Sequence, residues 1–197
     1  RGNIGTSKVS GNKHLTSTLY SVTPKCDSDN NKYVALCLDP GRLGPSNDLY
    51  KRQSDLDSNG QMGKLAQYFG AYLNIEDFNI AENESRIAAH VAARIVGVAN
   101  DFNATSNEDE YYMHLYYPYE VLGNYFKENP NVSYDELYNK LGEVISFTSD
   151  NTRQLVARYI TDAMALPDQE ESADEYYGFE ITNATSGETQ AYGSSGY

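Results

Sequence analysis

Two cysteines hold the most reactive side chains of this 197-residue chain. Cys26 stands in a polar turn, and Cys37 stands near the end of an apolar run. Two cysteines in a secreted chain usually form a disulfide, whereas a free thiolate acts as a nucleophile. Composition alone leaves both a Cys26–Cys37 disulfide and a reactive Cys37 open.

The residues around Cys37 and a glutamine far along the chain together resemble a known family. The segment Tyr33–Gly41 reads YVALCLDPG, and Arg153–Asp162 reads RQLVARYITD. These segments are similar to the two signatures of the thioester domains found at the tips of surface adhesins and pili of Gram-positive bacteria. In the first signature a cysteine ends a strand before a hydrophobic residue and a turn, and in the second a glutamine opens a helix. The second signature departs from the family at Arg153 (threonine there), Val156 (alanine) and Arg158 (tryptophan).

This resemblance implies an internal thioester between Cys37 and Gln154. The Cys37 thiolate would attack the Gln154 carboxamide and release ammonia. A lysine amine of a host surface or extracellular-matrix protein would later take the acyl group as an isopeptide bond. The implied protein is a single-turnover binding domain rather than an enzyme, and it needs no cofactor. It would sit outside a Gram-positive cell, anchored to the wall by segments beyond this chain.

Gln154 also has a simpler interpretation. On a helical wheel it lies with Arg158 and Thr161, away from the apolar stripe that contains Val156 and Ile160. A glutamine in such a position is usually solvated surface. The thioester therefore requires this polar face to pack against the strand that ends in Cys37.

A histidine base would point to another class of protein. A Cys37–His90 pair would suggest a secreted papain-like or transglutaminase-like enzyme. A lone histidine on a helix is more often a satisfied core residue, and the sequence context of a papain-type cysteine is missing. His14 and His114 are the remaining histidines. A third alternative is a non-covalent binding domain of a secreted protein, held by a Cys26–Cys37 disulfide.

One loop carries half of a calcium-binding pattern. Asp55, Asp57 and Asn59, followed by Gly60, match the first half of an EF-hand loop. Ala66 stands where the bidentate glutamate belongs, so we interpret the segment as a polar turn. Zinc is not expected, because no cysteine–histidine cluster is present.

The hydrophobic pattern predicts the elements that would position these residues. Strands are expected over residues 13–23 and 33–38, and a strand pair with a turn at Gly187 over 179–192. Residues 1–12 are expected to form a loose lead-in, and residues 41–63 a polar loop.

Helices are expected in the middle of the chain. The clearest amphipathic helix is marked by Ile87, Val91, Ile95 and Val98. A tyrosine-rich segment over 108–127 is expected to be interrupted at Pro118. Ser133–Glu136 forms a capping box before Leu137, Leu141 and Ile145. A further helix should run from Ser149 or Asp150 to about Ala165.

This order of strands, helices and strands predicts an α+β fold. We expect a single domain over residues 1–197, in which a helical part (about 64–166) is inserted between β segments (about 13–40 and 176–192). The N- and C-terminal strands would form a β subdomain packed against the helices, with Cys37 and Gln154 meeting at the junction.

Composition limits the classes of partner that the chain is expected to bind. The net charge of −13 argues against nucleic acid, since the chain cannot replace the counterions of a phosphate backbone. The same charge would repel an anionic membrane and attract a lysine-rich partner. No apolar stretch is long enough to cross a bilayer. Neither a signal peptide nor an anchor is evident, so we expect a domain cut from a longer protein.

Two features favour an extracellular location. The chain has 18 tyrosines and no tryptophan. It also carries four N-x-S/T sequons, at Asn83, Asn103, Asn131 and Asn183. The cluster Tyr111, Tyr112, Tyr116, Tyr117 and Tyr119 fits either a recognition surface or core packing.

Overall fold

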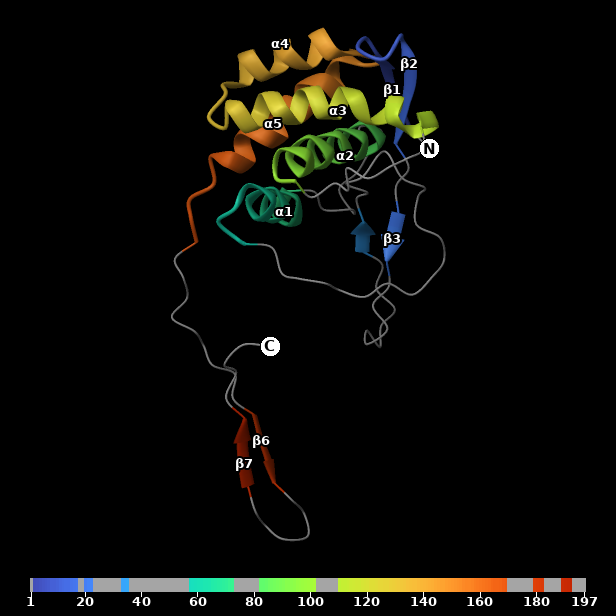
Figure 1. Cartoon of the computed structure of the whole chain (residues 1–197). Helices are drawn as coiled ribbons and strands as arrows, with labels where there is room; N and C mark the ends of the chain where they lie inside the picture. Colours follow the sequence, from blue (N-terminus) through green and yellow to red (C-terminus); the bar gives the residue numbers. More distant parts are fainter. Residues whose placement is uncertain are drawn as a thin grey trace. The chain divides into compact units, whose positions relative to one another are not determined.

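Figure 1 shows the chain as a computed structural model, which describes residues 2–17, 20–22, 33–35, 57–72, 82–101, 110–169, 179–182 and 189–192. The helices of the described part are α1 (Gln61–Tyr72), α2 (Glu82–Ala99), α3 (Glu110–Glu128), α4 (Tyr134–Val144) and α5 (Asp150–Met164). Its strands are β1 (Gly2–Ser7), β2 (Lys13–Ser17), β3 (Tyr20–Val22), β4 (Tyr33–Ala35), β5 (Ile145–Phe147), β6 (Phe179–Thr182) and β7 (Thr189–Tyr192).

A small antiparallel sheet in the order β2-β1-β5 joins distant parts of the sequence. β1 pairs with β2 through a turn, and its other edge pairs with β5, the short strand between α4 and α5. The pairing of β1 with β2 shifts between Asn3 and Gly5. Gly5 is required there, because its φ is 148° and a Cβ would collide with the carbonyl oxygen of Ser146. The sheet therefore fixes the start of α5.

Helix α2 is the centre of the fold. Every residue from Ile87 to Ala99 is buried, including the alanines between the larger apolar residues. A helix that is apolar on all sides is typical of a core position. The predicted stripe of Ile87, Val91, Ile95 and Val98 is confirmed as buried, but it is only part of the buried surface.

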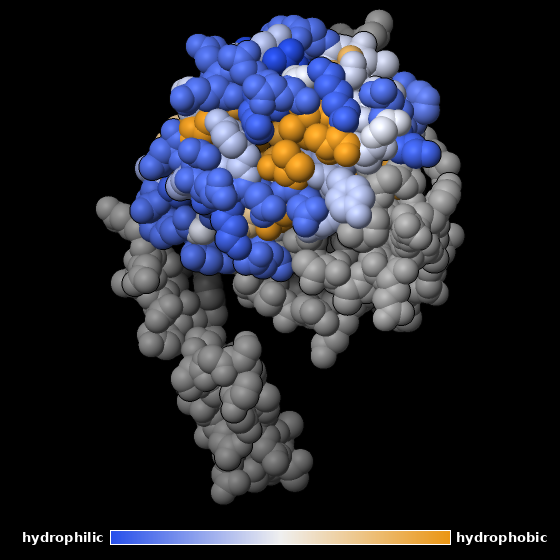
Figure 2. Space-filling model, turned by 45° about the horizontal axis from the view of Figure 1, so that its top comes forward, coloured by the Kyte–Doolittle hydropathy of each residue, from blue (hydrophilic) through white to orange (hydrophobic). Residues whose placement is uncertain are grey.

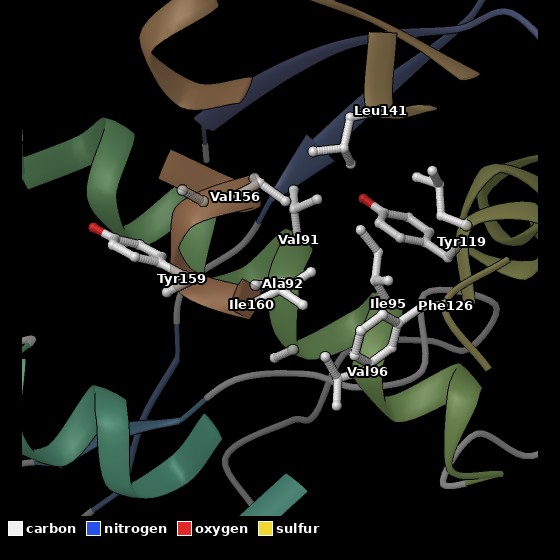
Figure 3. Packing of buried hydrophobic residues seen from close by; sticks show 14 of the residues in the cluster. Val91, Ala92, Ile95, Val96, Tyr119, Phe126, Leu141, Val156, Tyr159 and Ile160 are labelled. Carbon is white, nitrogen blue, oxygen red and sulfur yellow. The ribbon is translucent and has the colours of Figure 1, made fainter. Parts of the chain in front are cut away.

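The core forms where α3 and α5 pack against α2. In Figure 3, Val156, Tyr159 and Ile160 of α5 lie on one side of α2, and Tyr119 and Phe126 of α3 lie on the other. Helix α3 comes close to α2 at Gly123, where a Cβ would lie 2.5 Å from Cγ1 of Val98. Small residues at these crossings let the helices approach, and the larger ones fill the space between them.

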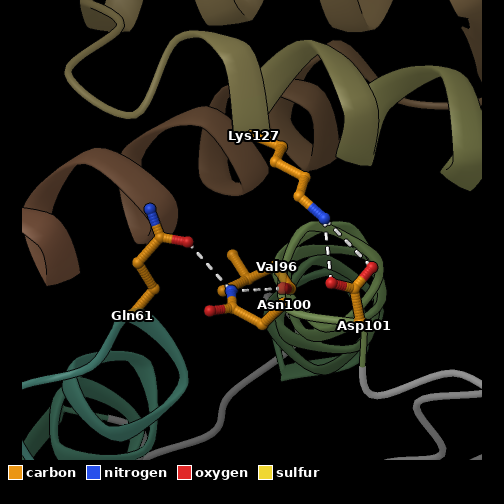
Figure 4. A network of polar contacts seen from close by, with 5 residues as sticks. All are labelled: Gln61, Val96, Asn100, Asp101 and Lys127. Atoms are coloured by element: carbon orange, nitrogen blue, oxygen red, sulfur yellow. Dashed lines mark hydrogen bonds and ion pairs between the residues drawn. The ribbon is translucent and has the colours of Figure 1, made fainter.

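The C-terminal end of α2 is closed by a polar network (Figure 4). The side-chain amide of Asn100 donates to the Val96 carbonyl at 2.8 Å and to Oε1 of Gln61 at 2.9 Å. Asp101 follows with a left-handed φ of 57° and pairs with Lys127 at 2.8 Å. The helix stops because this residue leaves the helical conformation, and the network joins its end to α1 and α3.

Two sequence-based expectations are wrong. Residues 1–12 are not a loose lead-in, because β1 is the central strand of the sheet and Ile4 is fully buried. The pattern hid this strand, since glycines and polar residues surround its single large apolar side chain. Pro118 does not interrupt its segment either, because it lies inside α3. Buried contacts of Tyr119 and Leu122 with the core offset the hydrogen bond that the proline cannot donate.

The other elements have the type that the sequence pattern predicts, although some of their bounds differ. β2 and β3 fall within 13–23, and β4 falls within 33–38. The capping box is present: the Ser133 hydroxyl accepts from the Glu136 amide, and the Ser133 amide donates to the Glu136 carboxylate at 3.0 Å. Helix α5 begins at Asp150 and ends at Met164, as expected within one residue. Helix α1 begins at Gln61, inside the expected loop.

The α+β class is confirmed. In the described part of the chain, β1 and β2 form a sheet with β5 beside five helices, whereas the strands expected near the C-terminal end, β6 and β7, pair with each other. The chain divides into two compact units, residues 1–166 and 167–197. In the second unit β6 and β7 form an antiparallel pair, in which Phe179 faces Tyr192 across the ladder.

Candidate functional site

Gln154 lies in the N-terminal half of α5 and is half-buried. The buried face of this helix carries Val156, Ile160 and Ala163, each with no exposed surface. The helical wheel therefore predicts correctly that Gln154 lies away from this buried stripe. Because the side chain is neither in the core nor fully exposed, its environment is set by neighbouring surface residues.

A carboxylate holds the amide nitrogen of Gln154. Nε2 of Gln154 donates a hydrogen bond to Oδ2 of Asp150, one turn earlier, at 2.7 Å. The other oxygen of Asp150 accepts from the hydroxyl of Tyr138 on α4 at 2.6 Å. The three side chains form a continuous line, Tyr138–Asp150–Gln154, across the α4–α5 contact. This line gives the Gln154 carboxamide a preferred direction at the surface.

Tyr138 is held in place by Arg153 of α5 and by Tyr134 of α4. The guanidinium of Arg153 lies 3.6 Å from the centre of its ring, and Nε of Arg153 donates to its backbone carbonyl at 2.8 Å. The ring of Tyr134 is stacked on it with centroids 6.0 Å apart. Arg153 fits against α4 because residue 142 is glycine: a Cβ at Gly142 would collide with the guanidinium.

These hydrogen bonds shift the pKa values of Asp150 and Tyr138. Hydrogen bonds from Tyr138 and then from Gln154 hold the pKa of Asp150 below its usual value. The hydrogen bond to Asp150 also raises the pKa of Tyr138. At neutral pH the site therefore combines an ionised carboxylate, a protonated phenol and a neutral carboxamide.

The N-terminal end of α5 is tied to α2 as well. The carboxylate of Glu84 accepts from the side-chain amide of Asn151 at 2.6 Å and from the hydroxyl of Ser149. These bonds, that from Ser149 first, lower the pKa of Glu84. The segment that carries Gln154 is thus attached to the central helix, to α4 and, through β5, to the sheet.

Sequence reasoning did not single out Asp150 and Tyr138. Asp150 and Gln154 stand four residues apart, and this spacing brings an aspartate and a glutamine together on a helix. It could have identified the first partner. Tyr138 lies on another helix, so no local pattern indicates its contact with Asp150.

The cysteines lie outside the described residues. Strand β4 is described to Ala35, and neither Cys37 nor Cys26 is part of the described chain. The Cys37–Gln154 pairing and the Cys26–Cys37 disulfide both stay predictions.

His90 is a core residue of α2 with no exposed surface. Its Nδ1 shares a hydrogen bond with the hydroxyl of Ser17, a buried residue at the end of β2. This contact ties β2 to the central helix. It agrees with the interpretation of His90 as a satisfied core histidine. His14 is exposed on β2, and the side chain of His114 lies outside the described part.

The half-pattern for calcium forms a local turn where it is described. Oδ1 of Asp57 accepts from the amide of Asn59 at 3.0 Å, and the amide of Gly60 donates to the Asp57 carbonyl at 3.1 Å. This is the geometry of an Asx turn that leads into α1. Asp55 lies outside the described residues. Within the described part, no group of three or more histidine, cysteine or acidic side chains is placed to hold a metal ion.

The tyrosine cluster divides between core and surface. Tyr116 and Tyr119 are buried against α2, and Tyr117 is 43% exposed. The side chains of Tyr111 and Tyr112 lie outside the described part. Arg94 of α2 lies over the ring of Tyr119, with 5.2 Å between Cζ and the centroid. Core packing therefore accounts for at least two of the five tyrosines.

A small pocket is lined by described residues. A pocket of about 200 Å³ lies at the C-terminal end of α5, beside the turn between α3 and α4. Ligand sites usually begin at about 300 Å³. Figure 2 shows hydrophilic side chains over most of the described surface on one face, around a small hydrophobic patch. Among the described helices, none is long and apolar enough to span a membrane.

Comparison with known proteins finds no relative of this chain. No family model matches the chain, and no curated protein or solved structure shows significant similarity to it. The two short motifs and the geometry around Gln154 are therefore the features that bear on function.

Proposed function

We propose that this chain is a cell-surface adhesion domain of the Gram-positive type, carrying an internal thioester between Cys37 and Gln154. The domain would react once with a lysine amine of a host surface or extracellular-matrix protein. The resemblance of Tyr33–Gly41 and Arg153–Asp162 to the two thioester signatures supports this function.

The observation that carries the proposal is the setting of Gln154. A glutamine on the outer face of a helix normally has a mobile carboxamide in water. Here the amide nitrogen is bound to Asp150, and Asp150 is bound in turn to Tyr138. An acyl donor must be held in one orientation before a nucleophile can reach it efficiently. A carboxamide whose nitrogen is hydrogen-bonded has a preferred orientation, and this supports the proposal.

The chemistry needs no cofactor. The Cys37 thiolate adds to Cδ of Gln154, ammonia leaves, and the acyl group stays activated as a thioester. A lysine amine then adds to the same carbon and displaces the Cys37 thiol. The net charge of −13 favours approach of a basic partner. The Gln154 acyl group is consumed, so each molecule reacts once.

Capture of a small amine tests this function. Native protein incubated with methylamine should gain one methylamine at Gln154 and then stop. Cys37→Ala and Gln154→Ala should each abolish the gain. Gln67→Ala is a matched control, because Gln67 is also a half-buried helical glutamine with a side-chain hydrogen bond, to the Ser58 carbonyl at 2.6 Å. Cys26→Ala should capture methylamine normally.

The alternatives give different results. Capture that survives Gln154→Ala would overturn the assignment of the acyl donor. Repeated turnover of a second substrate, abolished by His90→Ala in a protein that still folds, would indicate a cysteine-dependent enzyme. A reducible crosslink between Cys26 and Cys37, without capture, would indicate the disulfide-held binding domain.

A further inference from the structure

Helix α3 has an exposed face as well as a buried one. Its buried face contributes four large side chains to the core: Tyr116, Tyr119, Leu122 and Phe126. Its other face carries two of the three large hydrophobic side chains that are exposed in the described part of the chain. These are Tyr117, which is 43% exposed, and Val121, which is 37% exposed. Because they stand four residues apart, they lie one turn apart on the same side of the helix.

Tyr125 continues this line by one more turn. It is half-buried, and Nζ of Lys140 on α4 lies 5.4 Å from the centre of its ring. Tyr117, Val121 and Tyr125 thus form a continuous line of apolar and aromatic side chains, which we call the α3 row. Single apolar residues are normal on a protein surface. A contiguous row rich in tyrosine has instead the composition of a contact surface.

Negative charge borders the α3 row. Glu120 and Glu128 lie on the neighbouring line of the same side of α3, Glu120 half-buried and Glu128 exposed. Within the described part of the chain neither is in an ion pair, whereas Lys127 and Lys140 already bind carboxylates at 2.8 and 2.9 Å. The charge that is left uncompensated beside the row is therefore negative.

We propose that the exposed face of α3 binds a basic amphipathic helix of another protein, with apolar side chains against the α3 row and lysines beside Glu120 and Glu128. The apolar stripe of a partner helix has the same helical spacing as the row, so the two can align along their length. Lysines that flank this stripe would meet the two carboxylates. The net charge of −13 adds attraction at long range. This binding is non-covalent and does not require the thioester.

The same charges disfavour other occupants of this face. Two copies of the chain would bring net charges of −13 against each other. An anionic membrane surface would be repelled in the same way. The row is short, so we expect a transient complex of the class that buries less than about 1,200 Å² in total.

A model peptide tests the proposal. The probe is a fluorescently labelled amphipathic helix of leucine and dimethyl-lysine, and its binding is followed by fluorescence anisotropy. Dimethyl-lysine keeps its positive charge, but as a tertiary amine it cannot form an amide bond with an acyl group. Reversible binding is thus measured apart from the proposed covalent reaction. A matched peptide with glutamate in place of each dimethyl-lysine should bind about tenfold more weakly.

Variants of the α3 row should weaken this complex. Tyr117→Ser and Val121→Ser should each raise the Kd of the basic peptide about tenfold, as expected for side chains that anchor an interface. Val9→Ser is the matched control, because Val9 is 44% exposed but lies in the turn between β1 and β2. It should bind the peptide like the wild type. Circular dichroism should show that all three variants remain folded.

The acidic border gives a second comparison. Glu120→Gln should weaken binding about twofold at low salt, and this difference should disappear at high salt. Asp162→Asn removes the same charge from α5, at a residue that accepts a hydrogen bond from Tyr68 of α1. It should change binding less than Glu120→Gln, because this carboxylate lies on the side of α5 that faces α1.

The outcomes separate this surface from its alternatives. Equal losses in Tyr117→Ser and Val9→Ser, or equal binding of the glutamate peptide, would overturn the proposal. Self-association of the protein that Tyr117→Ser abolishes would assign the α3 row to a second copy and would also overturn it. Methylamine capture should be the same in all these variants. The failure of this inference would therefore leave the proposed thioester intact, and a protein without a thioester should still bind the peptide.

Discussion

Glu84 on α2 accepts a hydrogen bond from the side-chain amide of Asn151 on α5, with 2.6 Å between Oε2 and Nδ2. The two residues are 67 positions apart in the sequence, and their contact joins the start of the Gln154 helix to the central helix. A second bond, from Ser149, reaches the same carboxylate. An ionised glutamate therefore adds to the packing that holds the start of α5 against α2.

This contact should weaken in acid. The bonds from Ser149 and Asn151 lower the pKa of Glu84 below 4.5. A carboxyl group whose pKa is lowered by folding stabilises the fold at any pH above its unfolded-state pKa. This stability is lost as the pH falls through the lower pKa of the folded state. In a double-mutant cycle of Glu84→Gln and Asn151→Ala, the coupling should be about 0.5 kcal/mol at neutral pH. It should fade as the pH falls below 4.5, and urea unfolding measures it. A coupling that is unchanged by acid would contradict this assignment.

Tyr68 should make the fold sensitive to alkali. Burial, with the charge of Asp162 and a 3.3 Å hydrogen bond to it, raises the pKa of Tyr68 from 10.0 to about 12. The folded state thus prefers the protonated phenol, and its contribution to stability is complete below pH 10.0 and lost as the pH rises towards 12. Tyrosinate absorbance should show a late-ionising component that is absent in Tyr68→Phe. Asp162→Asn should move that component to lower pH, and an unmoved component would mean that Asp162 has no part in the shift.

The glycine at the bulge of β1 should be irreplaceable. Gly5→Ala combines a disfavoured φ with a collision against the Ser146 backbone, and it should cost about 3 kcal/mol of unfolding free energy. Gly11→Ala is the matched control, because Gly11 also has a positive φ, 70°, but has open space around it. It should cost about 1 kcal/mol, the cost of the left-handed conformation alone. Chemical denaturation of both variants gives the comparison, and equal losses would show that the β1–β5 contact is not tight.

The sequence predicted the helices well because their signals are local. The apolar spacing in α2 and α5 and the capping reciprocity of Ser133 and Glu136 lie within a few turns of the chain. β1 was missed, since its place at the centre of the sheet comes from pairing with β5, about 140 residues away. Pro118 was misjudged for a similar reason: burial of the residues around it overrides the local preference.

The candidate site was predictable only in part. The motif resemblance points to Gln154 through its neighbours in the chain, and the four-residue spacing of Asp150 and Gln154 indicates a contact between them on a helix. The contact of Tyr138 with Asp150 depends on how α4 and α5 pack, which no pattern in either helix specifies. Side-chain partners across two helices are set by tertiary structure, so the motif points to the proposed acyl donor and leaves out the groups that contact it.

The intact mass of the native, unreduced protein tests the central claim most directly. We predict a mass one ammonia below that of the sequence, with Cys26 open to alkylation, Cys37 protected, and the deficit mapped to a Cys37–Gln154 crosslink. Cys37→Ala and Gln154→Ala should each restore the full mass, and Cys26→Ala should keep the deficit. A native protein of full sequence mass, in which both cysteines alkylate freely, would contradict the thioester.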